Sequence, residues 1–228
     1  MESDYQIQIA AKAIISFTYS DTKNKQEKQN EQSESESNPS LANIVSSLQY
    51  LRDQIEVNRS CYQVIQIPKL LQSLSEIACY KIRIHFNKDI DRQSLEVRSL
   101  SRWSLIQIQG FGDEQVQSEL VNIGFGRVMS LSFCTAGGIG EEQDEEIRNG
   151  LYYIYRFLSD LHEGRTYGQP SFQPLPLLVR VSLEQIEEEG ANEEVEAQMK
   201  NNKGYYGLIK GWAKCVKATI LNHFIHQR

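Results

Sequence analysis

The sequence has few cysteines, few prolines and no long apolar segment. Its 228 residues include four cysteines and five prolines. None of the cysteines forms a C-x-x-C pair, which argues against the common cysteine zinc motifs and against a small disulfide-built scaffold. No run reaches about 18 apolar residues, and no apolar signal segment follows Met1. We therefore expect a protein of the cytoplasm or nucleus with no membrane partner.

An excess of positive charge is also absent. The chain carries 24 Lys and Arg residues against 30 Asp and Glu residues, which gives a net charge of -6 and an isoelectric point near 5.4. This balance does not favour general attraction to nucleic-acid phosphates or to anionic membranes. We expect no nucleic-acid partner, and the charge favours basic protein partners.

Catalytic and ligand-binding motifs are missing as well. The glycine-rich TAGGIG at residues 135–140 lacks the Lys-Ser/Thr ending of a phosphate-binding loop and suits a turn between helices. His223 and His226 share a helix face, but no cysteine or carboxylate nearby completes a metal site. No Ser, Thr or Cys lies in a recognisable nucleophile motif. The sequence predicts no catalytic residue, no metal and no cofactor.

What the sequence does contain is helical periodicity. Apolar residues recur three or four positions apart in nearly every segment, which predicts an all-α protein. The segment from Ser94 to Gln109 is one such helix, and we expect Gly110 to end it as a C-terminal cap. Residues 81–86, KIRIHF, alternate with period two and could form a strand, although their neighbours favour a helix. A sheet through residues 81–86 or 177–182 would contradict the all-α prediction.

Composition divides the chain into four parts. Residues 1–19 predict a helix of a first partial repeat, and residues 20–39, which contain no apolar side chain, predict a disordered polar insertion. Residues 40–167 form the region of helical repeats, and residues 168–228 predict helices that cap them. The last helix carries Lys210, Lys214 and Lys217 opposite an apolar face and has no acidic residue. We expect the apolar face to cap the stack; a second chain or an acidic partner could use it instead.

Two sets of segments repeat in the same order. VIQIPKLLQSL at residues 64–74 aligns with VNIGFGRVMSLS at residues 121–132, so that Pro68 falls on Gly126 and Lys69 on Arg127. The segment around Trp103 aligns with that around Tyr152 and with a segment that begins at Lys12. The aligned segments share a short helix that begins at a turn with Gly or Pro, followed by a longer helix with aromatic and aliphatic side chains. Such internal repetition indicates stacked helical units.

At these residues the sequence resembles the armadillo repeat family, and more particularly its importin-alpha group. The second helix of those repeats resembles G-x-x-P-x-L-x-x-L, which VIQIPKLLQSL matches with Gln66 in place of Gly. The third helix resembles V-R-x-x-A-x-W-x-L-x-N-I followed by Gly, which EVRSLSRWSLIQIQG at residues 96–110 matches with Gln107 in place of Asn. The resemblance spans Tyr5 to Gly164.

The resemblance implies a right-handed superhelical solenoid of about three to four armadillo-like repeats. In the importin-alpha group, the Trp and Asn of successive third helices line a concave groove that holds an extended basic peptide. Trp103 matches that Trp, and the amide of Gln107 can still donate and accept hydrogen bonds. At the next repeat Tyr152 and Arg156 take these two places, and we expect Arg156 to repel a basic peptide.

The implied function is that of a non-catalytic protein-binding scaffold, similar to an importin-alpha-like adaptor in nuclear import. Its partner would be a protein or an extended peptide, bound by Trp103, Gln107, Tyr152 and Arg156. One alternative is a structural subunit of a larger protein complex. A third hypothesis is a small enzyme or nucleic-acid-binding module whose site no motif reveals.

Overall fold

The computed structural model describes residues 2–27, 41–58, 61–80, 88–134, 144–166, 170–202 and 207–225. Within these ranges all regular structure is helical, apart from one bridge that pairs Arg165 with Phe172. Residues 177–182 are helical, and the prediction of an all-α protein is confirmed. The strand-like residues 81–86 and the glycine-rich residues 135–140 lie outside the described ranges.

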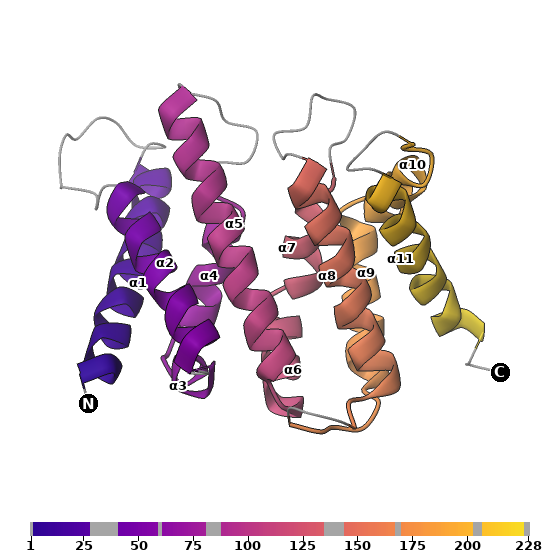
Figure 1. The fold of residues 1–228 in the computed structure, drawn as a ribbon, viewed down its shortest axis with the longest axis horizontal. Coiled ribbons are helices and arrows are strands. Elements are labelled where there is room, and N and C mark those ends of the chain that lie inside the picture. The colour runs from indigo at the N-terminus through magenta and orange to yellow at the C-terminus, as the bar shows by residue number, and fades with distance from the viewer. Residues whose placement is uncertain are drawn as a thin grey trace. The chain divides into compact units, whose positions relative to one another are not determined.

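The chain divides into two compact units, residues 1–108 and 109–228 (Figure 1). The first unit contains α1 (Glu2–Glu27), α2 (Leu41–Asn58), α3 (Cys61–Ile65), α4 (Leu70–Ala78) and most of α5 (Lys88–Phe111). The second contains the end of α5 and α6 (Glu114–Asn122), α7 (Phe125–Leu131), α8 (Asp144–Glu163), α9 (Pro176–Glu188), α10 (Ala191–Gln198) and α11 (Leu208–Ile225). The division falls inside the region predicted to hold the repeats.

In the first unit, α1 packs on α2 and α4. The buried apolar side chains of α1 recur at helical spacing along one face: Ile7, Ala10, Ala11, Ile14 and Phe17. The ring of Phe17 also packs on Tyr80 at the end of α4, with 5.1 Å between ring centroids. The amphipathic pattern of the sequence thus located this core correctly.

Helix α1 is longer than predicted. It continues to Glu27, so residues 20–27 are helical rather than disordered, whereas residues 28–39 lie outside the described ranges. The low apolar content of this stretch led to the wrong prediction. Lys, Gln and Glu have high intrinsic helix propensity, so a polar stretch that follows a packed helix can extend it.

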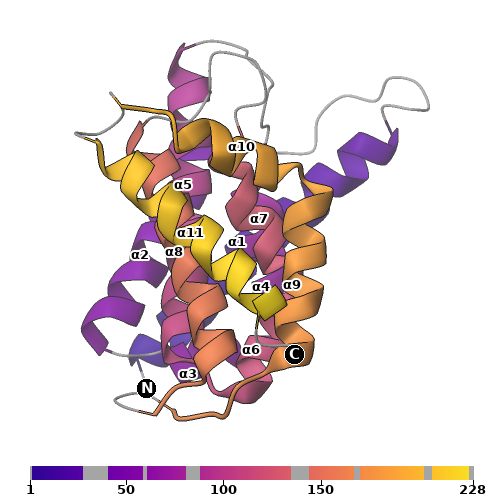
Figure 2. The same ribbon diagram turned by 90° about the vertical axis from the view of Figure 1, so that its right-hand side faces the viewer.

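In the second unit, α8 packs on α7, α9 and α11 (Figure 2). The apolar face of α8 is fully buried and consists of Ile147, Leu151, Ile154, Phe157, Leu158 and Leu161. Gly150 allows α8 to approach α7 closely, because a Cβ atom there would overlap the Ser132 hydroxyl and lie 3.2 Å from the Met129 carbonyl oxygen. These contacts form the core of the unit.

A left-handed residue precedes each of three short helices. Lys69 before α4, Gly124 before α7 and Gly190 before α10 have φ angles of 67°, 80° and 70°. The longer helices α5, α8 and α11 follow the three short ones. By backbone conformation, Lys69 is therefore equivalent to Gly124. The sequence alignment instead paired Lys69 with Arg127, three residues further along the chain.

Lys69 is the position where this backbone geometry is strained. A side chain in the left-handed region costs about 1–2 kcal/mol, and replacement by glycine removes this cost. Part of the resulting gain in stability is lost again, because glycine has greater freedom in the unfolded chain. We expect Lys69→Gly to raise the free energy of unfolding by about 0.5–1 kcal/mol, measured by urea denaturation. Lys69→Ala keeps the strain and is the control. Equal stability of the two variants would contradict the prediction.

Candidate functional site

Over residues 97–108, helix α5 reaches the surface of the first unit along a single narrow stripe. Between Val97 and Ile108, every side chain is buried except those of Ser99, Trp103 and Gln107, which are half-buried. These three residues follow one another at intervals of four, so they lie along one side of the helix. The structure thus brings Trp103 and Gln107 together on an accessible line, which we name the α5 stripe.

Two buried arginines on α5 set the rotation of this helix. Arg98 donates to the carbonyl oxygen of Tyr80 at 3.1 Å, and Arg102 donates to that of Ala78 at 3.4 Å. Both guanidinium groups therefore lie at the carboxyl end of α4, where the helix dipole favours positive charge. With these contacts made on its buried side, α5 turns the α5 stripe outwards.

The second pair of predicted residues lies on α8 in the second unit. Tyr152 is half-buried and packs on Trp212 of α11, with 4.8 Å between ring centroids. Arg156 is exposed, and its Nη2 atom would lie 3.4 Å from a Cβ atom added to Gly110. Tyr152 thus contacts α11, whereas Arg156 lies beside the last turn of α5, where a cation is favourable.

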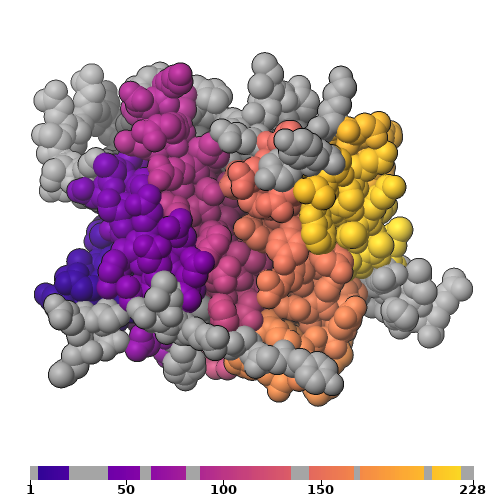
Figure 3. All heavy atoms as spheres, viewed as in Figure 1, coloured from indigo at the N-terminus to yellow at the C-terminus, as the bar shows by residue number. Residues whose placement is uncertain are grey.

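An aromatic cluster that sequence analysis did not identify joins α8 to α11. It consists of Tyr152, Tyr155 and Trp212, and the Tyr155 and Trp212 centroids are 5.5 Å apart. All three side chains are half-buried, and their hydroxyl and indole N–H groups make no hydrogen bond to the described part of the chain. In the sequence, Trp212 was indistinguishable from the apolar residues that cap a helix stack. Helices α8 and α11 both reach the surface seen in Figure 3.

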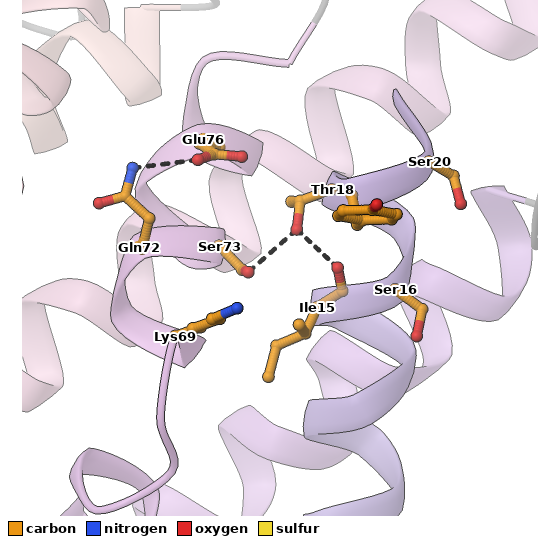
Figure 4. Close-up of a pocket in the computed structure, with 9 residues that line it drawn as sticks. Ile15, Ser16, Thr18, Ser20, Lys69, Gln72, Ser73 and Glu76 are labelled. Carbon is orange, nitrogen blue, oxygen red and sulfur yellow. Dashed lines mark hydrogen bonds between the residues drawn. The ribbon is translucent and has the colours of Figure 1, made fainter. Parts of the chain in front are cut away.

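A groove of about 560 Å³ lies between α1 and α4 in the first unit (Figure 4). Its lining is Ile15, Ser16, Thr18, Tyr19, Ser20, Lys69, Gln72, Ser73 and Glu76. The Thr18 hydroxyl is 2.9 Å from the Ser73 hydroxyl and donates to the Ile15 carbonyl oxygen at 2.8 Å. This lining includes no His, Cys or Asp, and the carboxylate of Glu76 accepts a hydrogen bond from Gln72 Nε2 at 3.0 Å.

Arg165 forms the centre of a polar cluster at the end of α5. Its Nη1 atom donates to the carbonyl oxygens of Gly110 and Gly112 at 2.8 and 3.1 Å. Its Nη2 atom donates to the Gln109 carbonyl oxygen and to Asp160 Oδ2, both at 3.0 Å. The amide of Gln109 also donates to Asp160 Oδ2, at 2.8 Å. Because the guanidinium group binds the carbonyl oxygens at the end of α5 together with Asp160, we assign Arg165 a structural role. One acceptor of the cluster, Gln109 Oε1, is buried without a hydrogen-bond partner among the described residues.

The same cluster corrects the predicted end of α5. Helix α5 runs through Gly110 to Phe111, and Gly110 is absent from the left-handed glycines of the described residues. Side chains therefore cap the helix where a left-handed glycine was expected: Arg165 binds its final carbonyl groups, and Gln117 Nε2 donates to the Gln109 carbonyl oxygen at 2.9 Å. In contrast, Gly124 does follow α6 in the left-handed conformation.

Within the described ranges, no three His, Cys, Asp or Glu side chains group as metal ligands would. None of the helices there combines the length and apolarity that crossing a bilayer requires. His226 lies outside these ranges, and so does the side chain of His223.

Comparison of the chain with protein-family models, with curated proteins and with solved structures finds no match. The resemblance to armadillo repeats stays a prediction from the motifs around Pro68 and Trp103.

Proposed function

We propose that this chain is a non-catalytic protein-binding scaffold in which armadillo-like repeats stack into a solenoid, similar to an importin-alpha-like adaptor. Three consecutive pairs of a short and a long helix, α4–α5, α7–α8 and α10–α11, support the proposal. A left-handed residue precedes each pair at the same point, which is what repeated units with one backbone plan require. Stacked units of this kind present extended surfaces for other chains.

The observation that carries the proposal is the α5 stripe. The Trp103 side chain is half-buried on a stretch of helix where only Ser99 and Gln107 are similarly accessible, so it offers apolar area to a partner at little ordering cost. Gln107 follows one turn later and can bond the backbone of an extended peptide through its amide. The pairing of an aromatic ring with an amide suits a peptide whose lysine or arginine stems pack on the ring.

One carboxylate lies along the side of α5 that carries the stripe, whereas the cations Arg98 and Arg102 bind carbonyl groups on its buried side. Glu96 lies seven residues before Trp103 on α5 and is half-buried. Its carboxylate accepts a hydrogen bond from Gln49 Nε2 at 3.0 Å, which holds the negative charge in place. A positively charged side chain bound at Trp103 would gain from this carboxylate, and the gain would fall with salt.

Removal of the Trp103 ring tests this assignment. We expect Trp103→Ala to weaken binding of a fluorescein-labelled lysine-rich peptide about tenfold, measured by fluorescence anisotropy at low salt. Tyr5→Ala removes an exposed aromatic side chain from α1 in the same unit, and its affinity should match that of the unaltered protein. Circular dichroism would verify that both variants fold. Retained affinity in Trp103→Ala would exclude the α5 stripe as the binding site.

A structural subunit of a larger complex is the second candidate, and the exposed face of α1 favours it. Tyr5, Ile9 and Tyr19 lie on one side of this helix, and 66%, 44% and 73% of their surfaces are exposed. Exposed apolar surface of this kind marks protein contacts. Light scattering of the purified protein distinguishes the two candidate functions. Self-association that Ile9→Glu abolishes favours the structural subunit, whereas a monomer that binds the lysine-rich peptide favours the adaptor.

A further inference from the structure

Two helices of the second unit carry accessible stripes with the same spacing. The stripe on α9 has four exposed residues, which are Leu177, Val181, Glu184 and Glu188. The stripe on α11 has two exposed and two half-buried residues, which are Lys210, Lys214, Lys217 and Leu221. Residues three and four positions apart lie on one side of a helix, so each set forms a continuous line. We name these lines the α9 stripe and the α11 stripe.

Exposed apolar side chains of the second unit gather on these two stripes. The described residues of this unit include four large apolar side chains that are exposed, and three of the four belong to the stripes. They are Leu177, Val181 and Leu221, which are 78%, 40% and 47% exposed. Exposed apolar side chains that cluster mark contacts with another chain. The fourth, Leu208, lies on another side of α11 and serves below as a control.

The second half of the α9 stripe is acidic. Residues 184–189 include four glutamates at the carboxyl end of α9, where the helix dipole disfavours negative charge. Two arginines compensate them in part, because Glu184 pairs with Arg180 at 3.1 Å and Glu188 pairs with Arg127 at 2.7 Å. All four of these side chains are exposed, and exposed ion pairs contribute little. Cations of another chain can therefore add to this end of the helix.

The α11 stripe lies away from the acidic residues of α8. Trp212 packs on Tyr152 and Tyr155 in the middle of α8. Lys214 is two positions beyond Trp212 and so projects from nearly the opposite side of α11. The acidic residues of α8 lie within its first three and its last four positions. The contact with α8 therefore leaves the lysines of the α11 stripe facing elsewhere.

The α11 stripe keeps a net positive charge after its contacts within the unit. Lys217 Nζ lies 2.7 Å from Glu196 Oε1 on α10, and its hydrogen bond and charge lower the pKa of the Glu196 carboxyl. Lys210 Nζ donates to the side-chain oxygen of Asn202 at 2.6 Å, and this acceptor is neutral. Lys214 is exposed and makes no ion pair with the described residues. Two of the three lysine charges are therefore uncompensated.

The two stripes match position by position when the helices run in opposite directions. Both have intervals of four, three and four, counted forwards from Leu177 and backwards from Leu221. Antiparallel packing that places these two leucines opposite each other fixes the remaining pairs: Val181 with Lys217, Glu184 with Lys214 and Glu188 with Lys210. The aliphatic stem of a lysine can cover a valine. Every position thus meets a side chain of suitable chemistry.

We propose that α11 of one copy of this chain packs antiparallel on α9 of a second copy, with Leu177 opposite Leu221 and Glu184 opposite Lys214. The charge and spacing of the α11 stripe select this occupant, because they complement the α9 stripe. Within one molecule α11 packs mainly on α8 and α10, which leaves both stripes accessible.

Each copy carries both stripes, and α9 and α11 run in opposite directions in Figure 2. Two copies related by a two-fold axis can therefore make the same contact twice. The proposal goes beyond the adaptor function, because Trp103 belongs to the other unit.

Reversal of one charge on each stripe tests the proposal. Sedimentation velocity of the full chain should show a dimer that weakens as salt is raised. We expect Lys214→Glu and Glu184→Lys each to weaken the dimer about tenfold, because like charges then lie opposite each other at both contacts. An equimolar mixture of the two variants should recover the affinity, since both contacts of a mixed dimer again join opposite charges. Circular dichroism would verify that the variants fold.

Two leucines on the same helix provide a matched pair of variants. Leu221 and Leu208 are both 47% exposed, and only Leu221 belongs to the α11 stripe. We expect Leu221→Gln to weaken the dimer about fivefold and Leu208→Gln to leave it unchanged. Ile9→Glu alters the exposed face of α1 in the first unit, and the dimer should survive it.

Three results would overturn the proposal: a monomer throughout the concentration range, no recovery when the two charge variants are mixed, or equal losses in Leu221→Gln and Leu208→Gln. Binding of the lysine-rich peptide and its loss in Trp103→Ala report on the adaptor function separately. Either idea can therefore fail alone.

Discussion

Replacement of Gly164 by alanine is expected to lower the free energy of unfolding by about 3 kcal/mol. Gly164 has a φ of 72°, where a side chain costs about 1–2 kcal/mol. An added Cβ atom would also lie 2.6 Å from the Phe172 carbonyl oxygen and 2.9 Å from the Pro174 nitrogen, and overpacking of this kind costs about 1–3 kcal/mol. Two effects act together at this position.

The backbone that the new Cβ atom would meet is held in place. The Arg165 amide donates to the Phe172 carbonyl oxygen at 2.8 Å, and the Leu175 amide donates to the Leu161 carbonyl oxygen at 2.8 Å. A shift of the loop to make room would stretch these hydrogen bonds. The overlap is therefore costlier than one with the end of a flexible side chain.

Gly190→Ala separates the two effects. Gly190 has almost the same φ, 70°, but the nearest atom to an added Cβ lies 3.9 Å away, on the side chain of Glu193. This variant should lose only the conformational part, about 1 kcal/mol. Both losses can be measured by urea denaturation followed by circular dichroism. Equal losses in the two variants would show that the close approach at Gly164 contributes nothing.

Local patterns in the sequence predicted the helices and much of the core. The buried face of α1 and the left-handed Gly124 follow from helical spacing and from the freedom of glycine, and both depend on residues that are near in sequence. The register of the repeats depends on backbone conformation, which residue identity did not show. At the first corner the left-handed position is occupied by Lys69, so matching Pro to Gly displaced the alignment by three residues.

The candidate sites divide in the same way. Trp103 and Gln107 could be placed on one helix face from their spacing and from a family motif. The contact of Tyr152 with Trp212 joins residues that are far apart in the chain, and no periodicity links them. The same holds for Arg165 and the end of α5, whose partners come from separate segments. The chain fold alone brings such groups together.

Arg165→Ala is expected to lower the free energy of unfolding by about 3 kcal/mol. The Arg165 and Asp160 side chains are only 11% and 22% exposed, so the loss of one leaves the other poorly compensated. The carbonyl oxygens of Gln109, Gly110 and Gly112 would also lose charged donors. The expected loss is below that of a fully buried pair because the Gln109 amide still donates to Asp160.

Two further substitutions show which interaction of Arg165 matters. Arg165→Met keeps an apolar stem near the Phe172 ring, over which the guanidinium carbon lies at 4.8 Å, but removes every donor. It should lose nearly as much stability as Arg165→Ala if hydrogen bonds to the end of α5 dominate. Arg165→Lys keeps the charge but cannot reach acceptors on two sides at once, so an intermediate loss is expected. The free energies of unfolding of the three Arg165 variants can be measured by chemical denaturation. If Arg165→Met is as stable as the unaltered protein, this side chain contributes through packing on Phe172 rather than through capping of α5.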